Sequence, residues 1–178
     1  MKKFLLLVAL VLFAVPVAVS AHEHRMVEAG GKAYSFTVGS LNEPLVVGDK
    51  SGVDLRVMTE GATPKPVEGL QDSLKVEVTA GSEKRVFDID PVYDTPGSYK
   101  AIFYPTTTAP LIYRFFGKIG NDPVDVSFMC KESGGFGCPL AREDYEFPKQ
   151  SQTNTVATVA LVLSILGCII GVGAWLKK

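Results

Sequence analysis

Residues 74–79 have the sequence LKVEVT, in which apolar Leu74, Val76 and Val78 alternate with polar side chains. Successive side chains of a β-strand point to opposite faces of its sheet, so this alternation predicts a strand with one face on a core. The same period of two recurs on both sides of this stretch. It predicts six further strands, at residues 34–38, 53–57, 86–89, 99–103, 111–117 and 124–128.

Turn-forming residues separate these seven stretches. Gly, Pro, Asp, Ser and Thr cluster at residues 48–49, 63–66, 81–82, 94–97 and 120–123. No stretch between them has the 3.6-residue period of an amphipathic helix, which excludes a nucleotide-binding α/β fold. About seven short strands with regular turns predict an all-β domain, specifically an immunoglobulin-like β-sandwich with a terminal loop over residues 32–138.

Residues 1–21 have the layout of a cleaved secretory signal peptide. Lys2 and Lys3 precede an apolar run over residues 4–15, and small residues precede a cleavage site after Ala21. The alternative is an uncleaved signal anchor, although the apolar run is short for a membrane span.

Residues 155–176 are apolar almost throughout and predict a single transmembrane helix. Lys177 and Lys178 follow as a cytoplasmic tail, because positive residues favour the cytoplasmic side. The protein is therefore expected in the cell membrane, with the bulk of the chain extracytoplasmic. A buried soluble helix is the alternative, but it would carry a polar face. Gly167 and Gly171 form a G-x-x-x-G pair, which suggests association with a membrane-protein partner or a homodimer through the helix.

The remaining segments are polar. Residues 139–154 have no periodicity and are expected to form a stalk between the domain and the membrane. Without the two lysines at each end of the chain, the 18 basic residues fall to 14 against 19 acidic ones, and the net charge of −1 becomes −5. A mildly acidic outer domain argues against a nucleic-acid partner.

Cys130 and Cys138 lie outside the predicted membrane helix and flank a glycine-rich stretch. In an oxidising compartment they are expected to form a disulfide. As an alternative, Met129, Cys130 and Cys138 are soft ligands that suit Cu(I).

The chain has two histidines, His22 and His24, and both directly follow the predicted cleavage site. Residues 22–31 are expected to form an exposed N-terminal segment. There the free amine of His22, two backbone amides and the imidazole of His24 could surround Cu(II) or Ni(II) in a square plane. His22 adds a second imidazole, Glu23 a carboxylate, and Met26 a soft ligand for Cu(I). The alternative is that these residues are polar and bind no metal.

Sequence signatures of catalysis are missing. The chain contains no G-x-S-x-G, no H-E-x-x-H and no P-loop, and no histidine falls within residues 32–138 to act as a base. We therefore expect a protein that is not an enzyme.

Four stretches carry a resemblance to a known group: HEH at 22–24, TVGSLNEP at 37–44, GVDLRV at 52–57 and DTPGSYKAIF at 94–103. They resemble small bacterial extracytoplasmic, C-terminally anchored proteins with copper-associated domains of the CopC and YtkA type. The resemblance implies copper handling through the terminal histidine, His22. Copper sites of that type also use a further histidine of the sandwich, which this chain lacks. The leading hypothesis is a membrane-anchored copper-binding domain, and the alternative is a non-enzymatic interaction or structural module of a larger membrane complex.

Overall fold

The structure is a computed structural model that describes residues 21–131 and 135–149. The predicted signal peptide, apart from Ala21, lies outside the described residues. So do the predicted membrane helix at 155–176, its Gly167 and Gly171, and the tail at 177–178. Among the described residues, no helix has the length and apolar character needed to cross a membrane.

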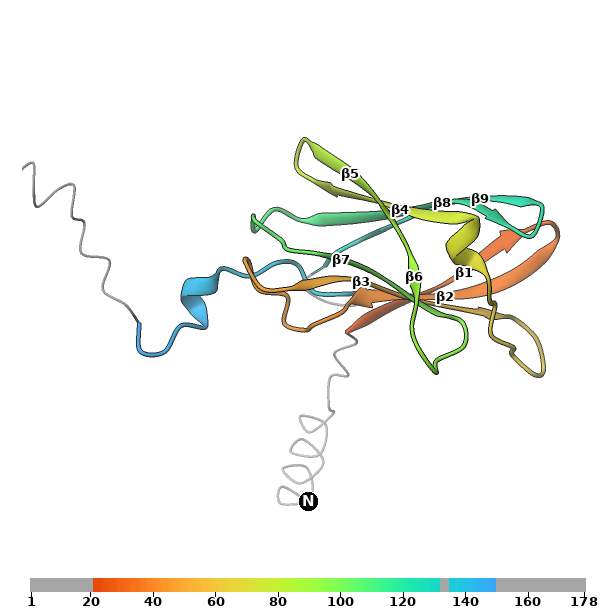
Figure 1. The fold of residues 1–178 in the computed structure, drawn as a ribbon, viewed down its shortest axis with the longest axis horizontal. Helices are drawn as coiled ribbons and strands as arrows, with labels where there is room; N and C mark the ends of the chain where they lie inside the picture. Colours follow the sequence, from red (N-terminus) through yellow and green to blue (C-terminus); the bar gives the residue numbers. More distant parts are fainter. Residues whose placement is uncertain (1–20, 132–134, 150–178) are drawn as a thin grey trace, which may run out of the picture. The chain divides into compact units, whose positions relative to one another are not determined.

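The described strands form two antiparallel sheets, which are the two layers in Figure 1. The first sheet has the order β1-β2-β3-β7-β6. Its strands are β1 (His22–Ala29), β2 (Lys32–Ser40), β3 (Ser51–Thr59), β7 (Ser98–Phe103) and the two-residue β6 (Asp90–Pro91).

The second sheet has the order β5-β4-β8-β9. Its strands are β4 (Leu74–Ala80), β5 (Glu83–Asp88), β8 (Leu111–Ile119) and β9 (Asp122–Met129). Two short 3₁₀ helices, η1 (Leu70–Asp72) and η2 (Arg142–Asp144), lie between and after the strands.

Aromatic side chains from both sheets meet in the core. Phe36 of β2 packs edge-on against Phe115 of β8 and is stacked on Phe128 of β9, with ring centroids 6.2 and 6.4 Å apart. All three rings are fully buried. The apolar residues that alternate in the sequence are the ones that face this layer, so the all-β fold and its two-sheet arrangement follow from the period of two.

The seven strands predicted from the sequence are confirmed as β2, β3, β4, β5, β7, β8 and β9. The prediction of an exposed segment at residues 22–31 is wrong, because His22–Ala29 forms β1 and pairs with β2 in continuous register. The domain therefore begins ten residues earlier than the alternation of apolar side chains indicates. Its inner-face positions include Glu23 and Arg25, so a hydrophobic period of two is not visible there.

The stalk predicted at residues 139–154 also starts too early. The backbone N–H of Leu140 donates to Leu45, and the N–H of Val47 donates to Leu140, at 2.8 and 3.0 Å. The guanidinium of Arg142 forms an ion pair with Asp49. Residues up to Asp144 thus belong to the domain as one compact unit, and a second unit begins at Tyr145.

Candidate metal centre

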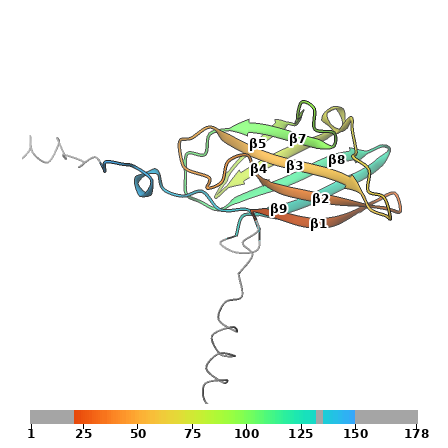
Figure 2. The ribbon, with the colours of Figure 1, turned by 90° about the horizontal axis from the view of Figure 1, so that it is seen from below.

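The strand β1 divides the predicted metal ligands between its two faces. His22, His24 and Met26 occupy alternate positions and point away from the core, whereas Glu23 and Arg25 point toward β9. β1 lies at the edge of its sheet with β2 as its neighbour, and Figure 2 shows the two strands side by side. The sheet therefore brings His22, His24 and Met26 to one face of β1, whereas Glu23 lies on the opposite face.

His22 is held by a carboxylate two strands away. In the register of the sheet, His22 lies opposite Gly39 of β2, and Gly39 lies opposite Asp54 of β3. The imidazole Nε2 of His22 is 3.1 Å from Oδ2 of Asp54. A Cβ at Gly39 would lie 2.4 Å from the Cδ2 of His22, so the ring passes over the position where any other residue would have a side chain.

His24 occupies the next row of the same face. Its Nδ1 lies 2.9 Å from the hydroxyl oxygen of Thr37, the residue opposite it on β2. The two imidazoles share one surface depression, which is lined by His22, His24, Thr37, Asp54, Arg56 and Ser98. Met26 follows on the same face and is 70% exposed. Within the described ranges, no group of three or more His, Cys, Asp or Glu side chains is close enough to hold a metal ion.

The side chain of Glu23 lies on the inner face of β1, where it contacts two basic side chains. Its side chain is 10% exposed, and it forms an ion pair with Arg25 and a second, at 3.6 Å, with the ammonium of Lys131. Arg25 also donates to the carbonyl of Ser127 at 2.7 Å and lies over the ring of Phe128. Glu23 therefore ties β1 to the residue that follows Cys130, Arg25 ties it to β9, and Glu23 is not placed to share a metal ion with the imidazoles.

The square plane of nitrogens expected from the sequence does not match a docked β1. A strand rises about 3.3 Å per residue, so the Cα atoms of His22 and His24 are about 7 Å apart, and their side chains point in the same direction. If the terminal amine, two amides and the imidazole of His24 are to surround one ion, residues 22–24 must first break their pairing with β2. The docked strand instead offers the two imidazoles side by side.

Glu43 lies between this face and the disulfide loop, which is the loop closed by Cys130 and Cys138. Partial burial raises the pKa of Glu43, and hydrogen bonds from the backbone N–H groups of Ser40 and Gly137, together with the charge of His22, oppose that rise. The carboxyl group of Glu43 thus lies within electrostatic reach of His22, next to the end of β2.

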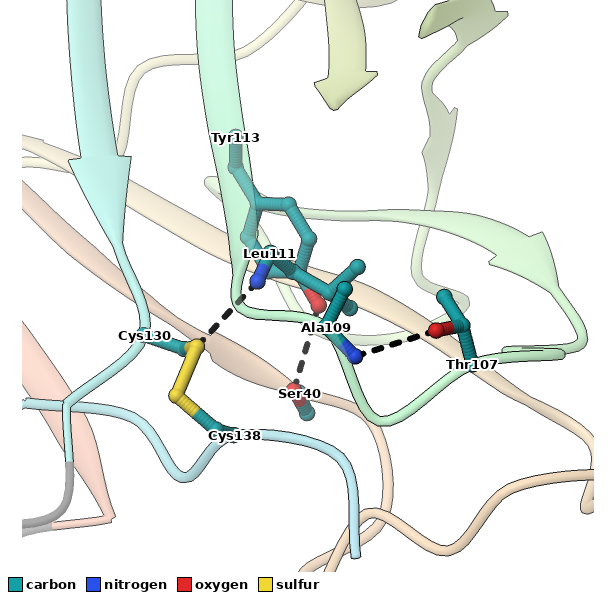
Figure 3. Close-up of a disulfide and its surroundings, with 7 residues drawn as sticks. All are labelled: Ser40, Thr107, Ala109, Leu111, Tyr113, Cys130 and Cys138. Atoms are coloured by element: carbon teal, nitrogen blue, oxygen red, sulfur yellow. Dashed lines mark hydrogen bonds between the residues drawn. A yellow bond between two sulfur atoms is a disulfide. The ribbon is translucent and has the colours of Figure 1, made fainter. Parts of the chain in front are cut away.

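The disulfide between Cys130 and Cys138 is present, as the sequence predicts. Figure 3 shows it next to Leu111, whose backbone N–H donates to the sulfur of Cys130 at 3.2 Å. Since the two sulfurs are bonded to each other, the alternative in which they bind Cu(I) as thiolates does not apply to this form.

The disulfide loop also contains a core residue, Phe136, that the alternation of apolar residues did not predict. Phe136 is fully buried and stacks on Tyr113, with ring centroids 4.6 Å apart. The hydroxyl of Tyr113 lies 3.2 Å from that of Ser40, the contact drawn in Figure 3, and burial raises the pKa of Tyr113. The only signal in the sequence is a lone aromatic residue in a glycine-rich loop closed by two cysteines.

Three residues that contact the histidines thus come from the register of the sheet and not from any motif: Gly39, Thr37 and Asp54. No family model, no curated protein and no solved structure matches the chain, so the resemblance to domains of the CopC and YtkA type rests on the quoted sequence stretches alone.

Proposed function

We propose that this protein is a membrane-anchored, extracytoplasmic β-sandwich protein of the immunoglobulin-like kind that binds copper at its mature N-terminus and is not an enzyme. Cleavage after Ala21 would make His22 the first residue, and the helix at 155–176 would hold the chain in the membrane. The observation that carries the proposal is that both histidines of the chain lie on one face of β1, in one depression.

The ligands we assign are nitrogens of His22 and His24. In the mature chain, the terminal amine of His22 and the Nδ1 of its own ring can close a small chelate ring around one copper ion. The imidazole of His24 supplies a third nitrogen through Nε2, since its Nδ1 contacts Thr37. Imidazole and amine nitrogens suit Cu(II), and Met26 on the same face suits Cu(I).

Asp54 is a positioning residue in this proposal. Histidines that bind metals commonly hold a carboxylate with their other ring nitrogen, which fixes the ring and raises its basicity. The contact between Nε2 of His22 and Asp54 has this form. Loss of such a partner typically weakens metal binding about 10- to 100-fold.

A Cu(II) titration of the full-length protein, purified from membranes in detergent, tests the proposal. N-terminal sequencing should first read His-Glu-His, and the copper complex should show an electron paramagnetic resonance spectrum of nitrogen ligation. Adding one residue before His22, or replacing His24 by Ala, should alter that spectrum and weaken binding, because each change removes one of the assigned nitrogens, and Asp54→Asn should also weaken binding. Because copper requires neutral imidazoles, affinity should fall on acidification. Equal affinity in all four proteins would overturn the site.

The second candidate function is an interaction module of a larger membrane complex. It is favoured by exposed apolar side chains, among them Val86, Ile102 and Tyr104, and by the small-residue pair Gly167 and Gly171. If the mature N-terminus binds no copper, this function becomes the better proposal.

A further inference from the structure

The strand β5 forms an edge of the second sheet. Among the described strands, its one hydrogen-bonded neighbour in the sheet is β4, and Figure 1 shows β5 as the last strand on its side. Five of its six residues are exposed, including Val86 at 47%, and only Phe87 is partly buried. The edge of a sheet presents unpaired backbone donors and acceptors, which a further strand can use.

The outer face of β5 carries charges in an order that complements itself. Lys84, Val86 and Asp88 alternate along this face, opposite Thr79, Glu77 and Lys75 of β4. If a second β5 runs antiparallel with Val86 opposite Val86, Lys84 of each copy lies opposite Asp88 of the other. Opposite charges in directly facing cross-strand positions stabilise a pair of strands, and like charges there destabilise it.

The inner face of β5 fits the same register. Arg85 lies over the ring of Phe87 within one chain, at 4.9 Å from the ring centroid. In the antiparallel pair, Arg85 of each copy would lie opposite Phe87 of the other, so the contact between cation and ring is repeated across the interface. Beside this edge the surface has a hollow of about 650 Å³, and Phe87, Phe103 and Tyr104 are among its lining residues.

We propose that β5 binds β5 of a second copy of this chain, antiparallel and centred on Val86. The pairing joins the four-stranded sheets of two copies into one continuous sheet. Such an interface is isologous, because the same patch serves both copies around a two-fold axis. The inner-face side chains of each copy then lie next to the hollow of the other. This inference does not depend on copper binding.

Site-specific cross-linking in native membranes tests the register. Val86→Cys, made in the full-length chain with Cys168→Ala, places two thiols on the two-fold axis, and mild oxidation should link the copies. Ser127→Cys is the matched control, since it is exposed on β9 at the opposite edge of the same sheet. A linked dimer from Val86→Cys but not from Ser127→Cys supports the proposal, and equal yields from the two variants overturn it.

Charge reversal then tests the complementarity. In the Val86→Cys background, Lys84→Asp or Asp88→Lys alone should lower the cross-linked fraction about tenfold, because like charges then face each other twice. The double variant Lys84→Asp/Asp88→Lys should restore it. Within one chain the double variant puts a new acidic side chain near Glu77 and a new basic one near Lys75, so recovery cannot come from contacts inside one copy. A double variant as poor as the single ones would overturn the proposed register.

Discussion

The imidazole of His22 lies across Gly39, which occupies the position directly opposite it on the neighbouring strand. Because Gly39 has no side chain, the ring reaches Asp54 on the third strand at 3.1 Å. Any Cβ at residue 39 would approach ring atoms to 2.4–2.6 Å, which real Cβ contacts do not allow.

Gly39→Ala should therefore displace the ring of His22 and break its contact with Asp54. We expect the imidazole resonances of His22 to shift in NMR spectra and Cu(II) affinity to fall about tenfold, as when an outer-shell partner is lost. The fold should persist, since Gly39 is not at a left-handed backbone position. Ser35→Ala, on the same face of the same strand, is the control and should leave the resonances of His22 in place.

Glu23→Ala should lower the free energy of unfolding and leave copper binding unchanged. The substitution leaves Arg25 and Lys131 without the carboxylate that they share, and because these cations are 39% and 50% exposed to water, the cost should be about 1 kcal/mol or less in denaturant unfolding. Glu28→Ala, an exposed glutamate on the same strand, should be close to neutral. If Glu23→Ala lost as much Cu(II) affinity as His24→Ala, Glu23 would have to be part of the proposed copper site.

Phe136→Ala should be strongly destabilising. The ring is fully buried and stacked on Tyr113, so its removal leaves a cavity and costs about 3–5 kcal/mol. Phe147→Ala is the matched control, because that ring is 97% exposed and its loss should leave the midpoint of chemical denaturation unchanged. Equal midpoints for the two variants would mean that the disulfide loop contributes nothing to the core.

The ion pair of Arg114 and Asp125 predicts a pH dependence of stability. Hydrogen bonds from the Arg114 guanidinium lower the pKa of Asp125 below its ordinary value of 3.8. A carboxyl group with a lowered pKa stabilises the fold above its unfolded pKa, and this contribution is lost as the pH falls through the folded value. The Tm of Asp125→Asn should therefore lie below that of the wild type at pH 7, and the gap should close toward pH 2. A gap that stays constant over this range would contradict the assignment.

The alternation of apolar residues is sufficient to predict seven strands and the all-β class, since most core-facing positions in those strands are apolar. It cannot predict β1, where charged Glu23 and Arg25 take inner positions and are stabilised by contacts with Lys131 and Ser127 that only the folded chain provides. The histidines are visible from their place after the predicted cleavage site. Their partner Asp54 is not, because nothing but strand register brings residues 32 positions apart to one row.

The contact of β1 with β9 also sets the order in which the chain is able to fold. Arg25 finds its acceptor in Ser127, 102 residues later, so the inner face of the N-terminal hairpin stays uncovered until nearly the whole domain has been made. At a synthesis rate of about 5–20 residues per second, the β1–β2 hairpin waits about 5–20 s for the strand of the other sheet that covers it. Domains dominated by such distant pairings fold slowly. Until β9 has been made, the inner side chains of β1 and β2 lack the cover that β9 provides, and this face is open to contact with other unfolded chains.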